Sequence, residues 1–347
     1  MEGIIGLKNR GNTCYLNTSI QCLSHLTLLT EYFLSNKYIN DLNNRCNETN
    51  GIKTNDIIIS KEYAKLIKAI WTSNCSIEPR SFHELIQKSD NKFEGYEQQD
   101  SQELLVLILD NLHEGLKYDV EITYSGKVEN TLDKLVIESI KRWKIDLNNK
   151  YSIIAELFFG QFINKVISLE SKNKDKIEIV SKKFEMFNML IIPVEGSTLY
   201  ESLSKHFEKE TLESPFYNEK TKKYINCCRE IKLMRIPKYL IIILKRYKNL
   251  MNGSHIKSNN MISFPIDDLD LTSYSEGYDK IKCKLKLISI GCHRGILSGG
   301  HYYSICRNYN NNKWYKYDDD DVSEFMLEIN KNIIFKDGYI LIYEKIE

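Results

Sequence analysis

The hydrophobic pattern of this 347-residue chain changes at about residue 159. Before that point apolar residues recur every three or four positions, as Leu16, Ile20 and Leu23 do, which is typical of helices with one buried face. After it, short runs rich in β-branched and aromatic residues, such as YLIIIL at 239–244, predict strands. We therefore expect an α+β fold, helical in its first part and sheet-rich in its second.

Local patterns refine this expectation. The segment DSQELLVLILDNLHEGL predicts a helix with Asp100 and Glu103 in its first turn, where the helix dipole favours acids. The polar segment from Asp41 to Asp56 is expected to be a loop. Two further polar stretches, at 170–176 and 217–226, are expected to be exposed tips between strands. With no internal repeat and no long Pro/Gly/Ser linker, a single unit is favoured over two independent domains.

Composition excludes several function classes. The net charge of +1 gives no field that would attract nucleic acid or an anionic membrane, so neither is expected as a partner. The N-terminus lacks a signal-peptide pattern, and the most apolar run is far shorter than the roughly 20 residues that span a bilayer. Nine cysteines, an odd number, favour a reducing compartment, and we expect an intracellular protein of the cytoplasm or nucleus.

Cys14 lies at the expected start of the first helix, in GLKNRGNTCYLNTSIQCL. Backbone N–H groups and the helix dipole stabilise a thiolate at that position. Asn12 and Thr13 are suitable N-cap residues, and the amide of Asn9 is a candidate donor to a developing oxyanion. The alternative is that Cys14 is simply one more small buried residue, as Cys22 is expected to be.

His301 is the histidine best placed by sequence to serve as a base, since it follows two glycines and begins a strand-like run. Seventeen residues later comes Asp318, at the end of the strand-like segment KWYKYD. A β-hairpin would bring Asp318 beside the His301 ring, where it would fix the tautomer of the imidazole. The run of four aspartates is otherwise a solvated acidic turn, and both descriptions hold if Asp318 faces inward.

These motifs together resemble the ubiquitin-specific proteases. GLKNRGNTCYLNTSIQCL is similar to the cysteine box of that family, and GYEQQDSQELLVLILDNLHE to its second box. LISIGCHRGILSGGHYYSICRN, followed by KWYKYDDDDVS, resembles its histidine box, and GYILIYEK its closing strand. The resemblance implies one papain-like catalytic domain over residues 1–347, with a helical thumb at about 1–158. Fingers and palm would occupy about 159–347, with the fingers near 163–185 and 215–235.

The resemblance also implies roles for individual residues. Cys14 would be the nucleophile, His301 the general base and acid, Asp318 the acid that orients His301, and Asn9 the oxyanion stabiliser. Asp319 matches a second, supporting acid. The substrate would be the C-terminal tail of ubiquitin on ubiquitinated proteins, and no cofactor is implied. The residues that would line the channel for this tail are Gln99, Asp100, Glu103, Tyr247, Gly299 and Gly300.

The chain departs from the family pattern in its fingers and its second box. Many family members bind zinc through two Cys-x-x-Cys pairs, but Asn218 and Thr221 stand where the second pair is expected, so no metal site is predicted. Gln102 stands where many relatives have histidine. Two alternatives to a deubiquitinase remain at this stage: a ubiquitin-binding scaffold with weak activity, and a hydrolase for another ubiquitin-like modifier.

Overall fold

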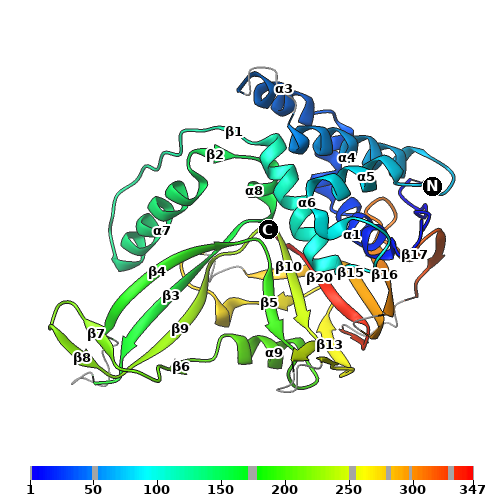
Figure 1. Cartoon of the computed structure of the whole chain (residues 1–347). Coiled ribbons are helices and arrows are strands. Elements are labelled where there is room, and N and C mark those ends of the chain that lie inside the picture. The colour runs from blue at the N-terminus through cyan, green and yellow to red at the C-terminus, as the bar shows by residue number, and fades with distance from the viewer. Residues whose placement is uncertain are drawn as a thin grey trace.

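The fold consists of a helical part, a central sheet and a second sheet that has α7 (Thr131–Leu147) packed against it (Figure 1). The computed structural model describes residues 2–48, 54–170, 178–249, 255–278, 283–296, 299–326 and 332–346. The predicted change of pattern at residue 159 falls between the last helix of the first part, which ends at Phe158, and a strand that begins at Gly160. The α+β prediction is confirmed.

The helical part is organised around two long helices, α4 (Asn55–Thr72) and α6 (Ser101–Leu116), which pack against each other. Their facing side chains recur at helical spacing and are buried, Ile67 on α4 and Ile108 on α6 among them. The other helices of this part are α1 (Cys14–Ser24), α2 (Thr27–Leu34), α3 (Tyr38–Glu48), α5 (Arg80–Ser89), η1 (Asn91–Phe93), α7 (Thr131–Leu147) and α8 (Ile153–Phe158).

The polar loop expected from Asp41 to Asp56 is wrong over most of its length. Asp41 lies within α3, which continues to Glu48, and α4 begins at Asn55. Tertiary contacts hold this asparagine-rich helix despite its weak propensity, because Leu42 is 2% exposed in the core and Asp41 accepts a hydrogen bond from Tyr32. Residues 49–53 lie outside the described part of the chain.

The central sheet has the strand order β18-β17-β16-β15-β20-β10-β5, with β14 paired to β15. The two strands expected to bear His301 and Asp318 are neighbours, antiparallel and in register from Ser304 opposite Tyr317 to Arg307 opposite Trp314. Its strands are β5 (Leu190–Pro193), β10 (Tyr239–Lys245), β14 (Leu269–Asp270), β15 (Lys284–Ile296), β16 (Gly299–Arg307), β17 (Trp314–Asp318), β18 (Asp321–Glu324) and β20 (Gly338–Lys345).

Both faces of this sheet are buried, which explains the uninterrupted apolar run on β10. Ile241 and Ile243 belong to the core formed with the helical part, whereas Ile242 and Leu244 belong to a second core on the opposite face. Strands covered on both faces read as continuous rather than alternating apolar segments. Helix α1 packs on β16 from the helical side, and this contact sets the position of the start of α1 relative to the sheet.

The second sheet has the order β4-β3-β9-β6, and α7 packs against it (Figure 1). It lies where the sequence predicted finger strands, and it is made of β3 (Gly160–Ser168), β4 (Ile179–Phe187), β6 (Glu210–Thr211) and β9 (Cys227–Arg235). The tip expected at 170–176 falls, apart from Glu170, outside the described residues. The tip expected at 217–226 is confirmed as the exposed hairpin of β7 (Phe216–Asn218) and β8 (Lys223–Ile225).

Asn218, at a position where the sequence comparison with the family expected a cysteine, closes this hairpin by hydrogen bonding. Its side-chain Oδ1 accepts from the backbone N–H of Lys220 at 2.9 Å and of Thr221 at 3.3 Å. An asparagine side chain that bonds the backbone ahead of it stabilises a tight turn on its own. The turn is therefore held by the side-chain amide of Asn218.

Smaller elements complete the described structure. No helix in the described ranges is both long and apolar enough to cross a membrane. The remaining elements are α9 (Leu199–His206), η2 (Thr272–Tyr274), β1 (Tyr118–Asp119) with β2 (Lys150–Tyr151), β11 (Tyr247–Asn249) with β12 (His255–Lys257), and β13 (Ile262–Pro265) with β19 (Asn332–Phe335).

Candidate active site

Cys14 is the first residue of α1 and is only 3% exposed. The turn that precedes it is shaped by Gly11 and Asn12, which both have positive φ angles, of 95° and 56°. The side-chain Oδ1 of Asn9 accepts hydrogen bonds from the backbone N–H of Gly11 at 2.9 Å and of Thr13 at 3.1 Å. Asn9 therefore fixes the turn that presents the thiol at the positive end of the helix.

The β16–β17 pairing brings His301 and Asp318 together, as the sequence predicted. The Nε2 atom of His301 lies 2.5 Å from Oδ1 of Asp318. Interaction with the Cys14 side chain and then the hydrogen bond to Asp318 raise the pKa of His301 to about 9, against burial, which lowers it. At neutral pH the ring carries a proton that it can donate to a leaving group.

Asp318 has a second partner that the sequence analysis did not single out. Its Oδ2 accepts a hydrogen bond from Nζ of Lys316 at 2.5 Å. Burial would raise the pKa of Asp318, but the hydrogen bonds from Lys316 and His301 outweigh it and lower the pKa. The signal was present in KWYKYD, because residues two apart on a strand lie on the same face.

Asp319, expected to be a supporting acid, holds two asparagines in place. Its Oδ2 accepts from Nδ2 of Asn9 at 2.9 Å, and its Oδ1 from Nδ2 of Asn17 at 2.8 Å. The residue has a positive φ of 55°, which turns its carboxylate back toward α1. The amide nitrogen that would stabilise an oxyanion is thus oriented by Asp319, and Asn17 is a further residue of this network that the sequence analysis missed.

The acids expected to contact a substrate tail have partners within the chain. Asp100 caps α6 by accepting from the N–H of Gln102, and it also accepts from the Tyr339 hydroxyl at 2.9 Å. Burial raises the pKa of Asp100. Glu103, in the first turn of α6, forms an ion pair with Lys92. The helix-start positions are as predicted, whereas contact of these acids with a substrate stays a prediction.

Gln98, rather than its neighbour Gln99, connects the helical part to the sheet beside His301. The side chain of Gln98 donates from Nε2 to the carbonyl of Gly300 at 2.7 Å, and its Oε1 accepts from the N–H of Gly300 at 2.7 Å. Gln98 thus bonds both backbone groups of Gly300, as a residue of a neighbouring strand would. No sequence signal distinguishes the two positions, since Gln98 and Gln99 are chemically identical.

The two glycines before His301 differ in their surroundings. A Cβ atom added to Gly299 would meet nothing within 4 Å, so this position is open, as expected for a channel. A Cβ atom on Gly300 would lie 2.2 Å from Nε2 of His293. The His293 ring therefore fills the space where a side chain at Gly300 would lie, and contact of Gly300 with a substrate stays a prediction.

Tyr247 lies next to the same histidine. Its hydroxyl is 2.8 Å from Nδ1 of His293, and Nζ of Lys257 is 2.9 Å from that atom. Burial, together with the charge of Lys257, lowers the pKa of His293 to about 4, so the ring is neutral and accepts hydrogen bonds. Tyr247 is thus fixed beside the strand that carries His301, and its contact with a substrate stays a prediction.

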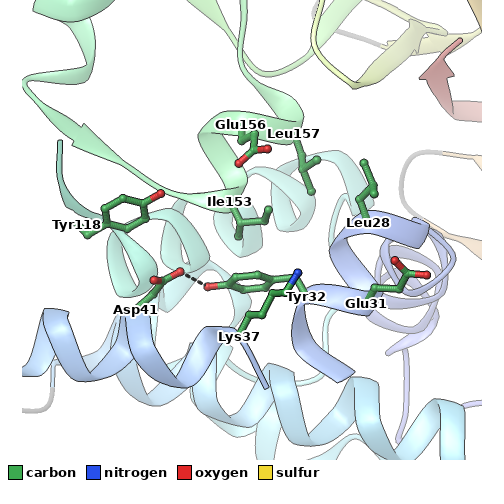
Figure 2. A pocket seen from close by; sticks show the side chains of 9 residues that line it. All are labelled: Leu28, Glu31, Tyr32, Lys37, Asp41, Tyr118, Ile153, Glu156 and Leu157. Atoms are coloured by element: carbon green, nitrogen blue, oxygen red, sulfur yellow. Dashed lines mark hydrogen bonds between the residues drawn. The ribbon is translucent and has the colours of Figure 1, made fainter. Parts of the chain in front are cut away.

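A separate hollow lies on the helical part of the molecule, with a volume of about 330 Å³ (Figure 2). Figure 2 shows the Tyr32 hydroxyl bonded to Asp41, with the carboxylate of Glu156 on the opposite wall. The hollow shares no lining residue with the Cys14 site. Its lining residues are Leu28, Glu31, Tyr32, Lys37, Asp41, Tyr118, Ile153, Glu156 and Leu157.

Comparison with known families assigns the chain. The family model described as ubiquitin carboxyl-terminal hydrolase matches residues 5–343, a span that includes Cys14, His301 and Asp318. The chain belongs to the ubiquitin carboxyl-terminal hydrolase family. The resemblance of its motifs to the ubiquitin-specific proteases is thereby confirmed.

Alignments with curated relatives cover nearly all of this ubiquitin carboxyl-terminal hydrolase family member. It is 30% identical over 351 residues to ubiquitin carboxyl-terminal hydrolase Usp2 of Drosophila melanogaster, an alignment that covers 99% of this chain and 35% of the relative. It is 29% identical over 364 residues to ubiquitin carboxyl-terminal hydrolase 2 of Homo sapiens, covering 99% of this chain and 55% of the relative. The chain thus spans between a third and about half of the length of these relatives.

Solved structures share the fold of this ubiquitin carboxyl-terminal hydrolase family member. The SAGA Ubp8/Sgf11/Sus1/Sgf73 DUB module bound to ubiquitin aldehyde contains a chain that matches with a TM-score of 0.75 at 22% identity. The match covers 100% of this chain and 70% of that one. The same module bound to monoubiquitin gives a TM-score of 0.75 at 21% identity, with the same coverage. The expected papain-like architecture is confirmed.

Proposed function

We propose that the chain is a deubiquitinating cysteine peptidase that hydrolyses the bond after the C-terminal glycine of ubiquitin. The observation that carries the proposal is the His301 ring, which bonds Asp318 through Nε2 and whose pKa is raised by the Cys14 side chain. A thiol, an imidazole and a carboxylate in this order form the relay that nucleophilic acyl transfer requires. Membership of the ubiquitin carboxyl-terminal hydrolase family supports ubiquitin as the modifier.

The reaction follows from these positions. His301 holds the proton of the Cys14 thiol, and the thiolate attacks the carbonyl carbon of the terminal glycine. The amide of Asn9, held by Asp319, stabilises the oxyanion together with backbone N–H groups at the start of α1. The amine leaves with a proton from His301, and water then hydrolyses the thioester and restores the thiol. Asp318 stays hydrogen-bonded to Nε2 of the His301 ring throughout the reaction, so Nδ1 is the nitrogen that exchanges a proton with the thiol.

The substrate channel would run between the helical part and the sheet, past the residues that the family resemblance assigns to it. Gly299 is the open position before His301, and Tyr247 would line the channel from the sheet side. Asp100 and Glu103 at the start of α6 suit the basic tail of ubiquitin. Solved relatives of the same fold are described as bound to ubiquitin aldehyde and to monoubiquitin, which supports ubiquitin as the partner.

A single catalytic domain over residues 1–347 is part of the proposal. The helical part would be its thumb, the sheet from β18 to β5 its palm, and the sheet around β3 its fingers. The two cores that flank the palm sheet support this reading, because β10 and β20 contribute side chains to both. A thumb expressed without the palm would lack His301 and Asp318.

The test is covalent capture by ubiquitin that carries a C-terminal propargylamide. We expect one adduct per chain, located at Cys14 by peptide mass spectrometry and abolished by Cys14→Ala. Cys75→Ser is the matched control, because Cys75 is an exposed thiol that lies in none of the site elements. Absence of an adduct on the folded chain would refute the proposal, as would labelling at Cys75 instead.

The same experiment separates the alternatives. Parallel reactions with other ubiquitin-like modifiers carrying the same electrophile report which modifier is preferred. Turnover of a ubiquitin–rhodamine amide, lost in His301→Gln, excludes a scaffold without activity. Binding of ubiquitin with no turnover would favour the scaffold.

A further inference from the structure

The carboxylate of Asp318 is shared between two positively charged or protonated partners. Its Oδ1 faces Nε2 of His301 and its Oδ2 faces Nζ of Lys316, each at 2.5 Å. A carboxylate with one partner rotates freely about its last bond, whereas one with a partner on each oxygen has a fixed plane. The orientation of Asp318 toward His301 thus depends on Lys316.

Lys316 is itself held in place by the strand beside it. Its ammonium lies 4.8 Å from the centre of the Tyr303 ring, a cation–π contact on β16. Tyr303 is buried and donates a hydrogen bond to Oδ2 of Asp337 at 2.9 Å. The Lys316 side chain is only 29% exposed. It is therefore a fixed charge rather than a mobile surface lysine.

The alternation of side chains on paired strands produces this arrangement. His301 and Tyr303 lie two apart on β16, and Lys316 and Asp318 lie two apart on β17, so all four share one face of the hairpin. The other titratable or charged groups around the pair are Cys14 on α1, Cys292, His293 and Arg294 on β15, Asp319 in the turn after β17, and Asp337 just before β20.

We propose that Lys316 is a positioning residue for the reaction, which fixes the Asp318 carboxylate toward His301 and limits how strongly that carboxylate stabilises the protonated ring. The inference rests on the proposed function, because it assigns Lys316 a part in the same relay. Lys316 touches neither Cys14 nor the open position at Gly299. It acts on the reaction through Asp318.

The sign of the effect follows from charge. A cation beside Asp318 opposes the uptake of a second positive charge on His301, so its removal lets the ring keep its proton to higher pH. For two unit charges on either side of one carboxylate at a partly exposed site, removal of the Lys316 charge should raise the pKa of His301 by about half a unit. Loss of the second hydrogen bond also frees the carboxylate to rotate, which we expect to lower kcat by about tenfold. KM should stay within about twofold, because no substrate contact is removed.

The experiment compares Lys316→Met with wild type, with Lys316→Arg as the conservative rescue. Lys313→Met is the matched control, because Lys313 lies in the same hairpin and pairs with Glu324 at 3.0 Å, away from Asp318. Initial rates with ubiquitin–rhodamine amide are measured from pH 5.5 to 10. For Lys316→Met we expect the alkaline limb to move up by about half a unit and kcat to fall, with Lys316→Arg and Lys313→Met close to wild type.

A second readout does not need turnover. The titration of the His301 ring, followed by NMR of ¹³C-labelled histidine in the Cys14→Ala chain, should shift to higher pH in the chain that also carries Lys316→Met. An unchanged ring titration would overturn the inference, as would an equal loss of kcat in Lys313→Met. Failure of wild type to react with ubiquitin propargylamide would instead refute the proposed function, and the ring titration would still decide the role of Lys316.

Discussion

Gly300→Ala places a methyl group where the structure has no room for one. The added Cβ would lie 2.2 Å from Nε2 of His293 and 2.8 Å from the backbone carbonyl of Arg294, both far inside contact distance. The first clash can be relieved if the His293 ring rotates, but this would break its hydrogen bond with the Tyr247 hydroxyl. The second clash is with backbone and requires the pairing of β15 with β16 to open.

The expected cost follows from overpacking. Forcing a methyl group into a filled site typically destabilises a protein by about 1–3 kcal/mol, which for a domain of this size lowers Tm by about 1–4 °C. Because the next residue is His301, the same displacement should move the imidazole relative to Cys14. A misplacement of the order of 1 Å at a reacting group lowers kcat/KM by up to about a hundredfold.

Gly299→Ala is the matched control, since its Cβ would meet nothing within 4 Å. The two variants differ by one position in the same strand and add the same methyl group. Thermal unfolding by circular dichroism gives Tm, and ubiquitin–rhodamine amide gives kcat/KM. We expect Gly299→Ala to keep the wild-type Tm and Gly300→Ala to lose both stability and activity. If the two variants had the same Tm, the packing of His293 against Gly300 would not be what requires a glycine there.

Three further predictions concern other parts of the molecule. In Gln98→Glu the carbonyl of Gly300 faces a carboxylate that has no hydrogen to donate, so kcat/KM should fall by about tenfold. A loss of kcat/KM no larger than that of Gln99→Glu would contradict this. The folded-state pKa of His301, about 9, exceeds the ordinary histidine pKa of 6.5, so its stabilising contribution is complete below pH 6.5 and is lost as pH rises to 9. The difference in free energy of unfolding between wild type and His301→Gln, from urea denaturation, should shrink across that window, and a constant difference would disprove the linkage. Asn218→Ala should cost about 1 kcal/mol and speed amide hydrogen exchange at Lys220 and Thr221, and unchanged exchange would show that the hairpin does not need the side chain.

The sequence predicted those parts of the fold in which periodicity and burial agree. The β16–β17 hairpin follows from short aromatic-rich runs separated by a polar turn, and it places Asp318 within 2.5 Å of His301. The start of α6 follows from an N-cap acid, Asp100, before an apolar body. In both places local propensity and tertiary packing favour the same structure.

The errors occur where tertiary contacts override local signals. The segment that contains Asp41 reads as a loop because it is rich in asparagine, yet the burial of Leu42 and the bond from Tyr32 hold it in α3. Gln98 and Lys316 were missed for a related reason. Gln98 bonds Gly300, about two hundred residues away in the sequence, and Lys316 bonds Asp318, a carboxylate already assigned to His301. A sequence motif identifies the reacting groups, but it does not identify the side chains that position them.

The bonds between the first residues of the chain and the turn after β17 bear on the order in which the site forms. Leu7 donates its N–H to the carbonyl of Asp319 at 2.9 Å, and Asn17 bonds the side chain of the same residue. Synthesis from the N-terminus produces Cys14 long before His301 and Asp318, so a nascent chain carries a thiol without its base. Contacts this distant in sequence also slow folding, because a long loop must close before they form. The reactive centre is therefore complete only after β16 and β17 are made, and a chain that stops short of β16 carries a thiol without its base.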